Sequence, residues 1–141
     1  DFSLTGEILP GWNVIASYAY IDGEVTEDNT DIVGNRIPDV PKHNASLWTT
    51  YEIQSGELQG LGFGLGANFV GKRQGGLDNS FETDSYFLTN ASVFYRQNNW
   101  RTQLNFENLF DVDYVSTTGN RVRFNEQGDP LTIRASVSYT F

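Results

Sequence analysis

The sequence contains no cysteine and a single histidine among its 141 residues. Without cysteine there is no disulfide framework, no thiolate zinc site and no thiol nucleophile. One histidine, His43, gives little basis for a metal cage or a histidine-based catalytic triad. We therefore expect a protein that is not an enzyme and that carries no metal or cofactor of its own.

Basic residues are also scarce: 9 lysines and arginines stand against 18 aspartates and glutamates, which gives a formal net charge of −9. Nucleic-acid binding depends on clustered basic side chains. Because the basic residues here are few and scattered along the chain, we expect no nucleic-acid partner.

Long hydrophobic runs are absent, and no apolar stretch approaches the roughly 18 residues that a membrane-spanning helix needs. Aromatic residues, in contrast, make up 14% of the sequence, which argues against a disordered chain. The strands of a transmembrane β-barrel alternate lipid-facing and water-facing residues, so their mean hydropathy is low. Hydropathy therefore excludes a helical membrane protein but leaves a transmembrane barrel open.

Alternation of apolar and polar residues with a period of two runs through almost the whole chain and predicts β-strands. In residues 61–72, for example, Leu61, Phe63 and Leu65 fall on one face, while three glycines fall on the other. Most of the predicted strands have about the 9–11 residues that a tilted strand needs to cross a bilayer. The seven predicted strands are residues 2–8, 12–21, 43–53, 61–72, 87–97, 100–114 and 131–141.

The connections between these strands alternate between short and long, which is typical of outer-membrane barrels with tight periplasmic turns and long external loops. Aromatic residues collect near both ends of the strands, as in the two aromatic girdles of such barrels. The pattern predicts an all-β, antiparallel transmembrane barrel segment of about seven strands. A soluble barrel or sandwich, with the rings in its core, is the alternative fold.

Four segments carry motifs that resemble one known family. They are Leu-Pro-Gly-Trp at 9–12, a loop-to-strand segment at 34–48 that begins Gly-Asn-Arg-Ile-Pro-Asp, Asn-Leu-Phe-Asp-Val-Asp-Tyr at 108–114, and Ser-Tyr-Thr-Phe at 138–141. These segments are similar to parts of TonB-dependent siderophore receptors, especially the ferrichrome-receptor type, and they occur in the same order as in that family. Together they span nearly the whole chain.

This resemblance implies a barrel of about 22 strands that is plugged by an N-terminal domain and imports ferric siderophores with energy from TonB. Residues 1–141 would then form the C-terminal part of the barrel, its last third by strand number, with no plug domain in this chain. Physical reasoning agrees, because seven strands fall short of the eight of the smallest barrels. Unpaired sheet edges in lipid would cost on the order of tens of kcal/mol.

The resemblance also implies a location and partners. The location is the outer membrane of a Gram-negative cell, where lipid and lipopolysaccharide would surround the barrel. The expected partners are a ferric siderophore, TonB acting through the missing plug, and the barrel assembly machinery. The last of these would recognise the C-terminal strand, where an apolar stripe ends on phenylalanine; an ordinary lipid-facing role is the simpler interpretation. The residues of this predicted assembly signal are Ile133, Val137, Tyr139 and Phe141.

Several residues have the alternation parity of the barrel interior and are candidate lumen or plug contacts. A tryptophan that faces the lumen is unusual, and in this family it is expected to pack against the plug. The inward charges are expected to pair with each other or with the plug. The glycines at 62, 64 and 66 lie in a strand pattern, which indicates close backbone approach rather than a phosphate loop. The candidate lumen or plug contacts are Trp48, Glu52, Arg101, Glu107 and Arg134.

Five acidic residues lie between positions 22 and 31 and could gather calcium or the cations that bridge lipopolysaccharide, although a solvated loop is the simpler interpretation. His43 has lipid-side parity, which favours a structural role. Two other functions stay open. One is a small outer-membrane binding or adhesion module with acidic external loops, and the other, an outer-membrane hydrolase, has only scattered carboxylates to support it. The five acids are Asp22, Glu24, Glu27, Asp28 and Asp31.

Overall fold

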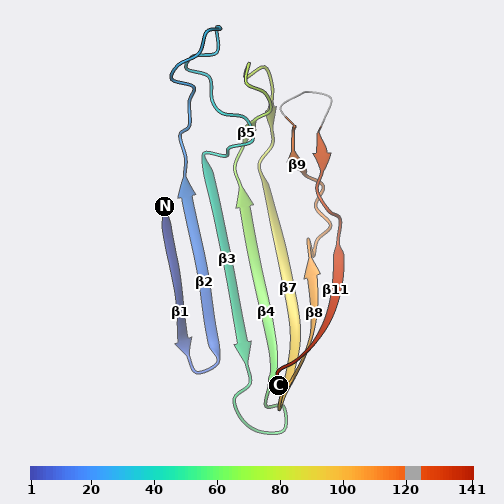
Figure 1. Cartoon of the computed structure of the whole chain (residues 1–141). Coiled ribbons are helices and arrows are strands. Elements are labelled where there is room, and N and C mark those ends of the chain that lie inside the picture. Colours follow the sequence, from blue (N-terminus) through green and yellow to red (C-terminus); the bar gives the residue numbers. More distant parts are fainter. Residues whose placement is uncertain (120–124) are drawn as a thin grey trace.

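The computed structural model describes residues 1–119 and 125–141. Its main feature is one antiparallel sheet of seven strands in the order β1-β2-β3-β4-β7-β8-β11 (Figure 1). Two small two-stranded sheets, β5 with β6 and β9 with β10, lie in the connections. The strands are β1 (Phe2–Leu9), β2 (Trp12–Tyr20), β3 (His43–Glu52), β4 (Leu61–Val70), β5 (Arg73–Gln74), β6 (Glu82–Thr83), β7 (Tyr86–Gln97), β8 (Trp100–Glu107), β9 (Val115–Thr117), β10 (Glu126–Gln127) and β11 (Thr132–Tyr139).

The seven predicted strands are confirmed, and in the main sheet every two consecutive ones pair with each other. The clearest difference is at the end of β8, which stops at Glu107 although the alternation continues to position 114. Asn108 and Asp111 adopt left-handed backbone conformations, with φ of 51° and 52°. Two left-handed residues three positions apart end the strand, because extended backbone requires negative φ.

The register of the sheet places residues in rows that are alternately polar and apolar across six strands. One polar row consists of Asn13, Thr50, Gly64, Ser92, Asn105 and Arg134. The next row, one residue along each strand, consists of Trp12, Tyr51, Phe63, Val93, Leu104 and Ala135. Because successive side chains of a strand point to opposite faces, these rows give the sheet one polar and one apolar face.

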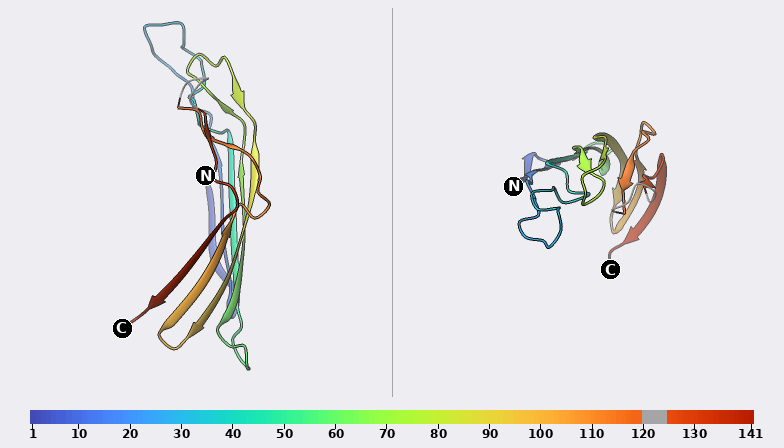
Figure 2. Two further views of the ribbon diagram at one scale, coloured as in Figure 1. Left: turned by 90° about the vertical axis from the view of Figure 1, so that its right-hand side faces the viewer. Right: turned by 90° about the horizontal axis from the view of Figure 1, so that it is seen from above.

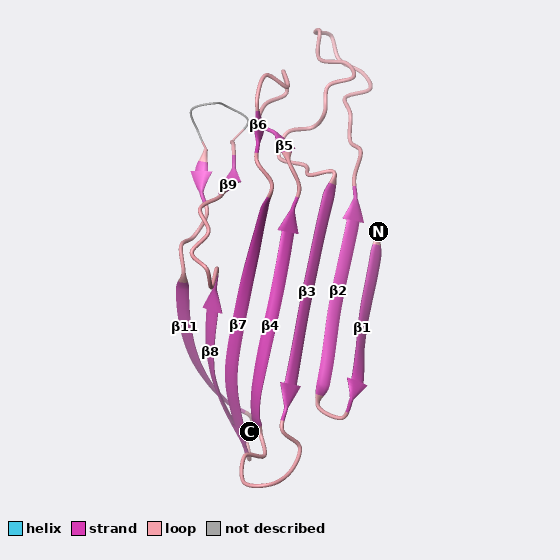
Figure 3. Cartoon of the chain, turned by 180° about the vertical axis from the view of Figure 1, so that it is seen from behind, coloured by secondary structure: helices cyan, strands magenta, loops and turns pink. Residues whose placement is uncertain are grey.

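The sheet is strongly curved, and from above its strands follow an arc (Figure 2). Short connections lie at one end of the strands and long loops at the other (Figure 3). The two outermost strands, β1 and β11, form opposite edges and do not pair with each other in the described part of the chain. The chain therefore forms one curved sheet with two open edges.

The apolar face is exposed along its whole length. Leu65 at its centre is 54% exposed, and Phe63 beside it is 49% exposed. Among the described residues, the one buried large hydrophobic side chain is Phe94, on the other face. A soluble barrel or sandwich buries its rings in a core, whereas here most rings lie on the surface, as in a wall that faces lipid.

No helix in the described ranges is long and apolar enough to cross a membrane.

Candidate functional site

The polar face of the sheet is built around a stripe of glycines on β4. Trp48 on β3 lies directly opposite Gly66, and its indole occupies the space where side chains of Gly64 and Gly66 would be. The ring of Phe94 on β7 covers Gly62 in the same way. Glycine is needed at these positions because any Cβ would overlap the rings, which lie close to the β4 backbone.

Charged residues extend this face on both sides of the glycine stripe. Arg96 on β7 forms an ion pair with Glu52 on β3 at 3.5 Å, reaching across β4. Arg134 on β11 pairs with Glu107 on β8 at 3.2 Å. Arg101 has no carboxylate partner among the described residues; its guanidinium lies over the Phe94 ring, 4.3 Å from the centroid.

The structure thus places all the predicted lumen residues on one face of the sheet and joins some of them. Glu107 and Arg134 contact each other, and Glu52 contacts Arg96, which the sequence analysis did not single out. The alternation on β7 already places Arg96 on the inward face, and this was the signal by which the sequence could have revealed it. Trp48 lies apart from these charges, over the glycines. Contact of any of these residues with a plug stays a prediction.

Three residues of the predicted assembly signal lie on β11, an edge strand of the sheet, and the fourth, Phe141, lies just after it. Ile133 and Val137 are more than half exposed on the apolar face. The Tyr139 ring packs between Trp100, at 4.8 Å, and Phe141, at 5.0 Å. This arrangement fits a lipid-facing edge, and recognition by the assembly machinery stays a prediction.

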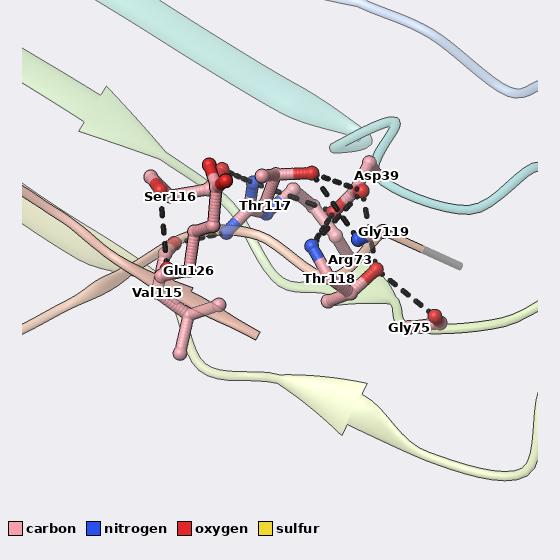
Figure 4. Close-up of polar contacts among 9 residues, drawn as sticks. All are labelled: Asp39, Arg73, Gly75, Val115, Ser116, Thr117, Thr118, Gly119 and Glu126. Atoms are coloured by element: carbon pink, nitrogen blue, oxygen red, sulfur yellow. Dashed lines mark hydrogen bonds and ion pairs between the residues drawn. The ribbon is translucent and has the colours of Figure 1, made fainter. Parts of the chain in front are cut away.

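At the loop end, three long connections meet at a polar cluster formed by Asp39, Arg73 and the segment 115–119 (Figure 4). Arg73, only 4% exposed, donates to the carbonyl oxygens of Ser116, at 2.7 Å, and Val115. Its guanidinium also lies 3.7 Å from the Asp39 carboxylate. One buried cation therefore contacts both of the other connections.

Asp39 and Thr118 complete this cluster. The Asp39 carboxylate accepts hydrogen bonds from the Thr117 hydroxyl at 2.8 Å and from the backbone N–H of Thr118 at 3.1 Å. The Thr118 hydroxyl lies 3.1 Å from Asp39 and 2.9 Å from the Gly75 carbonyl oxygen, and Thr118 is fully buried. Sequence analysis missed these contacts, although Asp39 lies within the family-like motif at 34–48.

The motif at 108–114 has a structural role at the end of β8. Asn108 is 3% exposed, and its side-chain amide donates to the carbonyl oxygens of Val112, at 2.9 Å, and Asp129, at 3.1 Å. Its backbone N–H donates to the side chain of Asn90 on β7 at 2.9 Å. Asn108 therefore joins the end of β8 to the segment that leads into β11.

The acidic connection between β2 and β3 has local partners. Asp22 forms an ion pair with Lys42 at 3.1 Å, and this contact lowers the pKa of the Asp22 carboxyl. Hydrogen bonds from the side chain and backbone of Thr30 lower the pKa of Asp28. In the described ranges, no three histidine, cysteine or acidic side chains converge as metal ligands.

His43 lies at the start of β3, on the apolar face. Its Nδ1 lies 2.9 Å from the Tyr18 hydroxyl, and its ring packs 5.2 Å from that of Tyr20. These contacts give His43 a place within an aromatic group at the loop end of the sheet.

Comparison with known proteins shows the family to which this chain belongs. A family model described as TonB dependent receptor-like, beta-barrel matches residues 1–109. The metal-pseudopaline receptor CntO of Pseudomonas aeruginosa is 34% identical over 143 aligned residues, which cover 100% of this chain and 20% of that protein. The ferrichrome outer membrane transporter/phage receptor of Escherichia coli K12 is 40% identical over 113 residues, covering 77% of this chain and 15% of that protein.

Solved structures agree. The siderophore receptor PiuA of Acinetobacter baumannii superposes with a TM-score of 0.80 at 31% identity, covering 97% of this chain and 20% of that one. The chain thus spans about a fifth of the length of the relatives that it matches. It belongs to the TonB-dependent receptor β-barrels, which are outer-membrane transport receptors of Gram-negative bacteria and not enzymes.

Proposed function

We propose that the full-length protein is an outer-membrane receptor that imports a metal–siderophore complex with energy from TonB. Residues 1–141 would supply the C-terminal seven strands of its barrel, and a plug domain elsewhere in the protein would contact TonB. Relatives named as metal-pseudopaline and catecholate siderophore receptors, which align with the whole chain, support this uptake function.

The observation that carries the proposal is a curved sheet with one exposed apolar face, one polar face and two open edges. In lipid, each unpaired backbone group at an edge costs several kcal/mol. Further strands must therefore pair with β1 and β11. This requirement favours a receptor barrel over a small closed module with acidic loops.

We further propose a ferrichrome-type ligand. The support is the 40% identity to a ferrichrome transporter and the motif at 34–48. Relatives named for catecholate siderophores are 28% identical.

The polar face would contact the plug through Trp48, Arg101 and the two ion pairs, and the apolar face would contact lipid and lipopolysaccharide.

Uptake of radioactive iron tests this function. The full-length receptor is produced in a Gram-negative host that lacks its own siderophore receptors, and ferrichrome is compared with a ferric catecholate. We expect iron accumulation that requires TonB and is faster with ferrichrome. Uptake that persists in a TonB-deficient host would contradict the energy source, and preference for the catecholate would contradict the ferrichrome assignment. No uptake of any metal–siderophore complex would leave the binding-module function as the better account.

A further inference from the structure

A cavity of about 390 Å³ lies at the loop end of the sheet, next to the Asp39–Arg73 cluster, with which it shares Val115. It lies between the segment that enters β7 and the segments that flank the small sheet of β9 and β10. The side chains that matter for its chemistry are those of Asp84, Tyr86, Asp113, Tyr114 and Gln127.

Two tyrosine rings form one wall of this cavity. The centroids of Tyr86 and Tyr114 lie 4.4 Å apart, and the rings are inclined by 38°. Tyr114 is held in place because its carbonyl oxygen accepts a hydrogen bond from the Gly128 N–H at 2.8 Å and its ring lies where a side chain at Gly128 would be. Arg73 lies 5.6 Å from the centroid of Tyr86. The aromatic wall is therefore formed before any ligand binds, which lowers the entropic cost of binding.

Two carboxylates give the cavity its charge. Asp84 and Asp113 are both exposed, and neither forms an ion pair with another described residue. The side-chain amide of Gln127 donates to Asp113 at 2.9 Å, which fixes that carboxylate without neutralising it. The nearby cation, Arg73, is compensated by Asp39. The described residues that line the cavity therefore give it a net negative charge next to aromatic faces.

We propose that this cavity binds the ammonium or guanidinium group of a small organic molecule. Aromatic faces attract organic cations through the ring quadrupole, and the carboxylates add direct charge pairing. A bare metal ion fits less well, because no three ligating side chains converge in the described ranges. An anionic group would meet two unpaired carboxylates. The inference goes beyond the proposed transport function, since it concerns equilibrium binding without energy from TonB.

Binding of three small probes to the purified full-length receptor in detergent tests the site. The probes are benzyltrimethylammonium, benzyl alcohol and phenylacetate, which share a phenyl ring and differ in charge. Saturation-transfer NMR titrations would give their dissociation constants. We expect the cation to bind at least tenfold more tightly than benzyl alcohol, phenylacetate to show no binding, and added salt to weaken binding of the cation.

Variants then assign the binding to this cavity. The double variant Asp84→Asn with Asp113→Asn is expected to weaken cation binding at least tenfold, and Tyr114→Leu about fivefold. Glu57→Gln, which removes an exposed acid in the connection between β3 and β4, is the matched control and should leave binding unchanged. Equal binding of the cation and benzyl alcohol, no binding of the cation, or unchanged binding in the double variant would overturn the proposal.

Discussion

Replacing Asp39 by asparagine is expected to loosen the loop cluster without affecting the sheet. The substitution keeps the shape of the side chain but leaves the Arg73 guanidinium, which is 4% exposed, without its compensating charge. Removing one partner of a fully buried ion pair costs about 3–5 kcal/mol. The Asp39 side chain is 29% exposed and the pair is 3.7 Å apart, so we expect a smaller cost, about 2–3 kcal/mol.

Hydrogen exchange of the full-length receptor, followed by mass spectrometry, measures this cost locally. A loss of 2–3 kcal/mol corresponds to exchange that is about 30- to 150-fold faster. The acceleration should be confined to the amides of the cluster, including those of Thr118 and Gly75, with β2 to β4 unchanged. Asp22→Asn is the matched control, because its ion pair with Lys42 is exposed to solvent and contributes little to stability. Equal exchange in Asp39→Asn and the control would refute the reasoning, as would loss of protection throughout the sheet.

Three further predictions concern the sheet, the turn after β8 and the acidic loop. Gly66→Val should destabilise the receptor by about 1–3 kcal/mol, measured by thermal unfolding in detergent, because the new side chain would overlap Trp48. Asn108→Ala should lower the free energy of unfolding in urea by about 2–4 kcal/mol, because the side chain bonds two carbonyl oxygens and the backbone is left-handed. For Asp28, whose pKa is lowered in the fold, the stabilisation of its turn is present above the ordinary value of 3.8 and is lost as the pH falls below it. Exchange of the Thr30 amide should therefore accelerate below about pH 4.

Each of these has an outcome that would count against it. Gly66→Val should be partly rescued by a smaller residue at position 48, and an absence of rescue would mean that the ring is not the obstacle. Asn29→Ala, in an exposed loop, should be neutral where Asn108→Ala is not. Exchange at Thr30 that is independent of pH, after correction for intrinsic rates, would show that the Asp28 carboxylate does not hold the turn.

The sheet could be predicted from the sequence because one physical constraint acts on nearly every residue. A wall between lipid and a polar interior forces strict alternation, so strand positions and the facing of Trp48 or Arg134 follow from parity. The end of β8 could not be predicted in this way. Alternation continues past Asn108, and the left-handed conformation depends on contacts with Asn90 and Asp129.

The loop cluster was outside the reach of the sequence for a different reason. Asp39 and Thr118 are 79 residues apart, and no periodic pattern links them. The partner of Glu52 was also hidden, because Arg96 lies two strands away and reaches it across β4. Parity assigns a residue to a face, whereas its partner depends on the register of every strand between.

The central claim is that the apolar face of this sheet contacts lipid within a larger barrel. Spin labels placed one at a time at residues 45–50 of β3 in the full-length receptor, reconstituted in lipid vesicles, test it directly. Collision with oxygen, which concentrates in lipid, is compared with collision with a water-soluble nickel complex. The account predicts high oxygen accessibility at Ala45, Leu47 and Thr49 and low values at the positions between, with a period of two. Uniform accessibility along the strand, or maxima at the even positions, would contradict it.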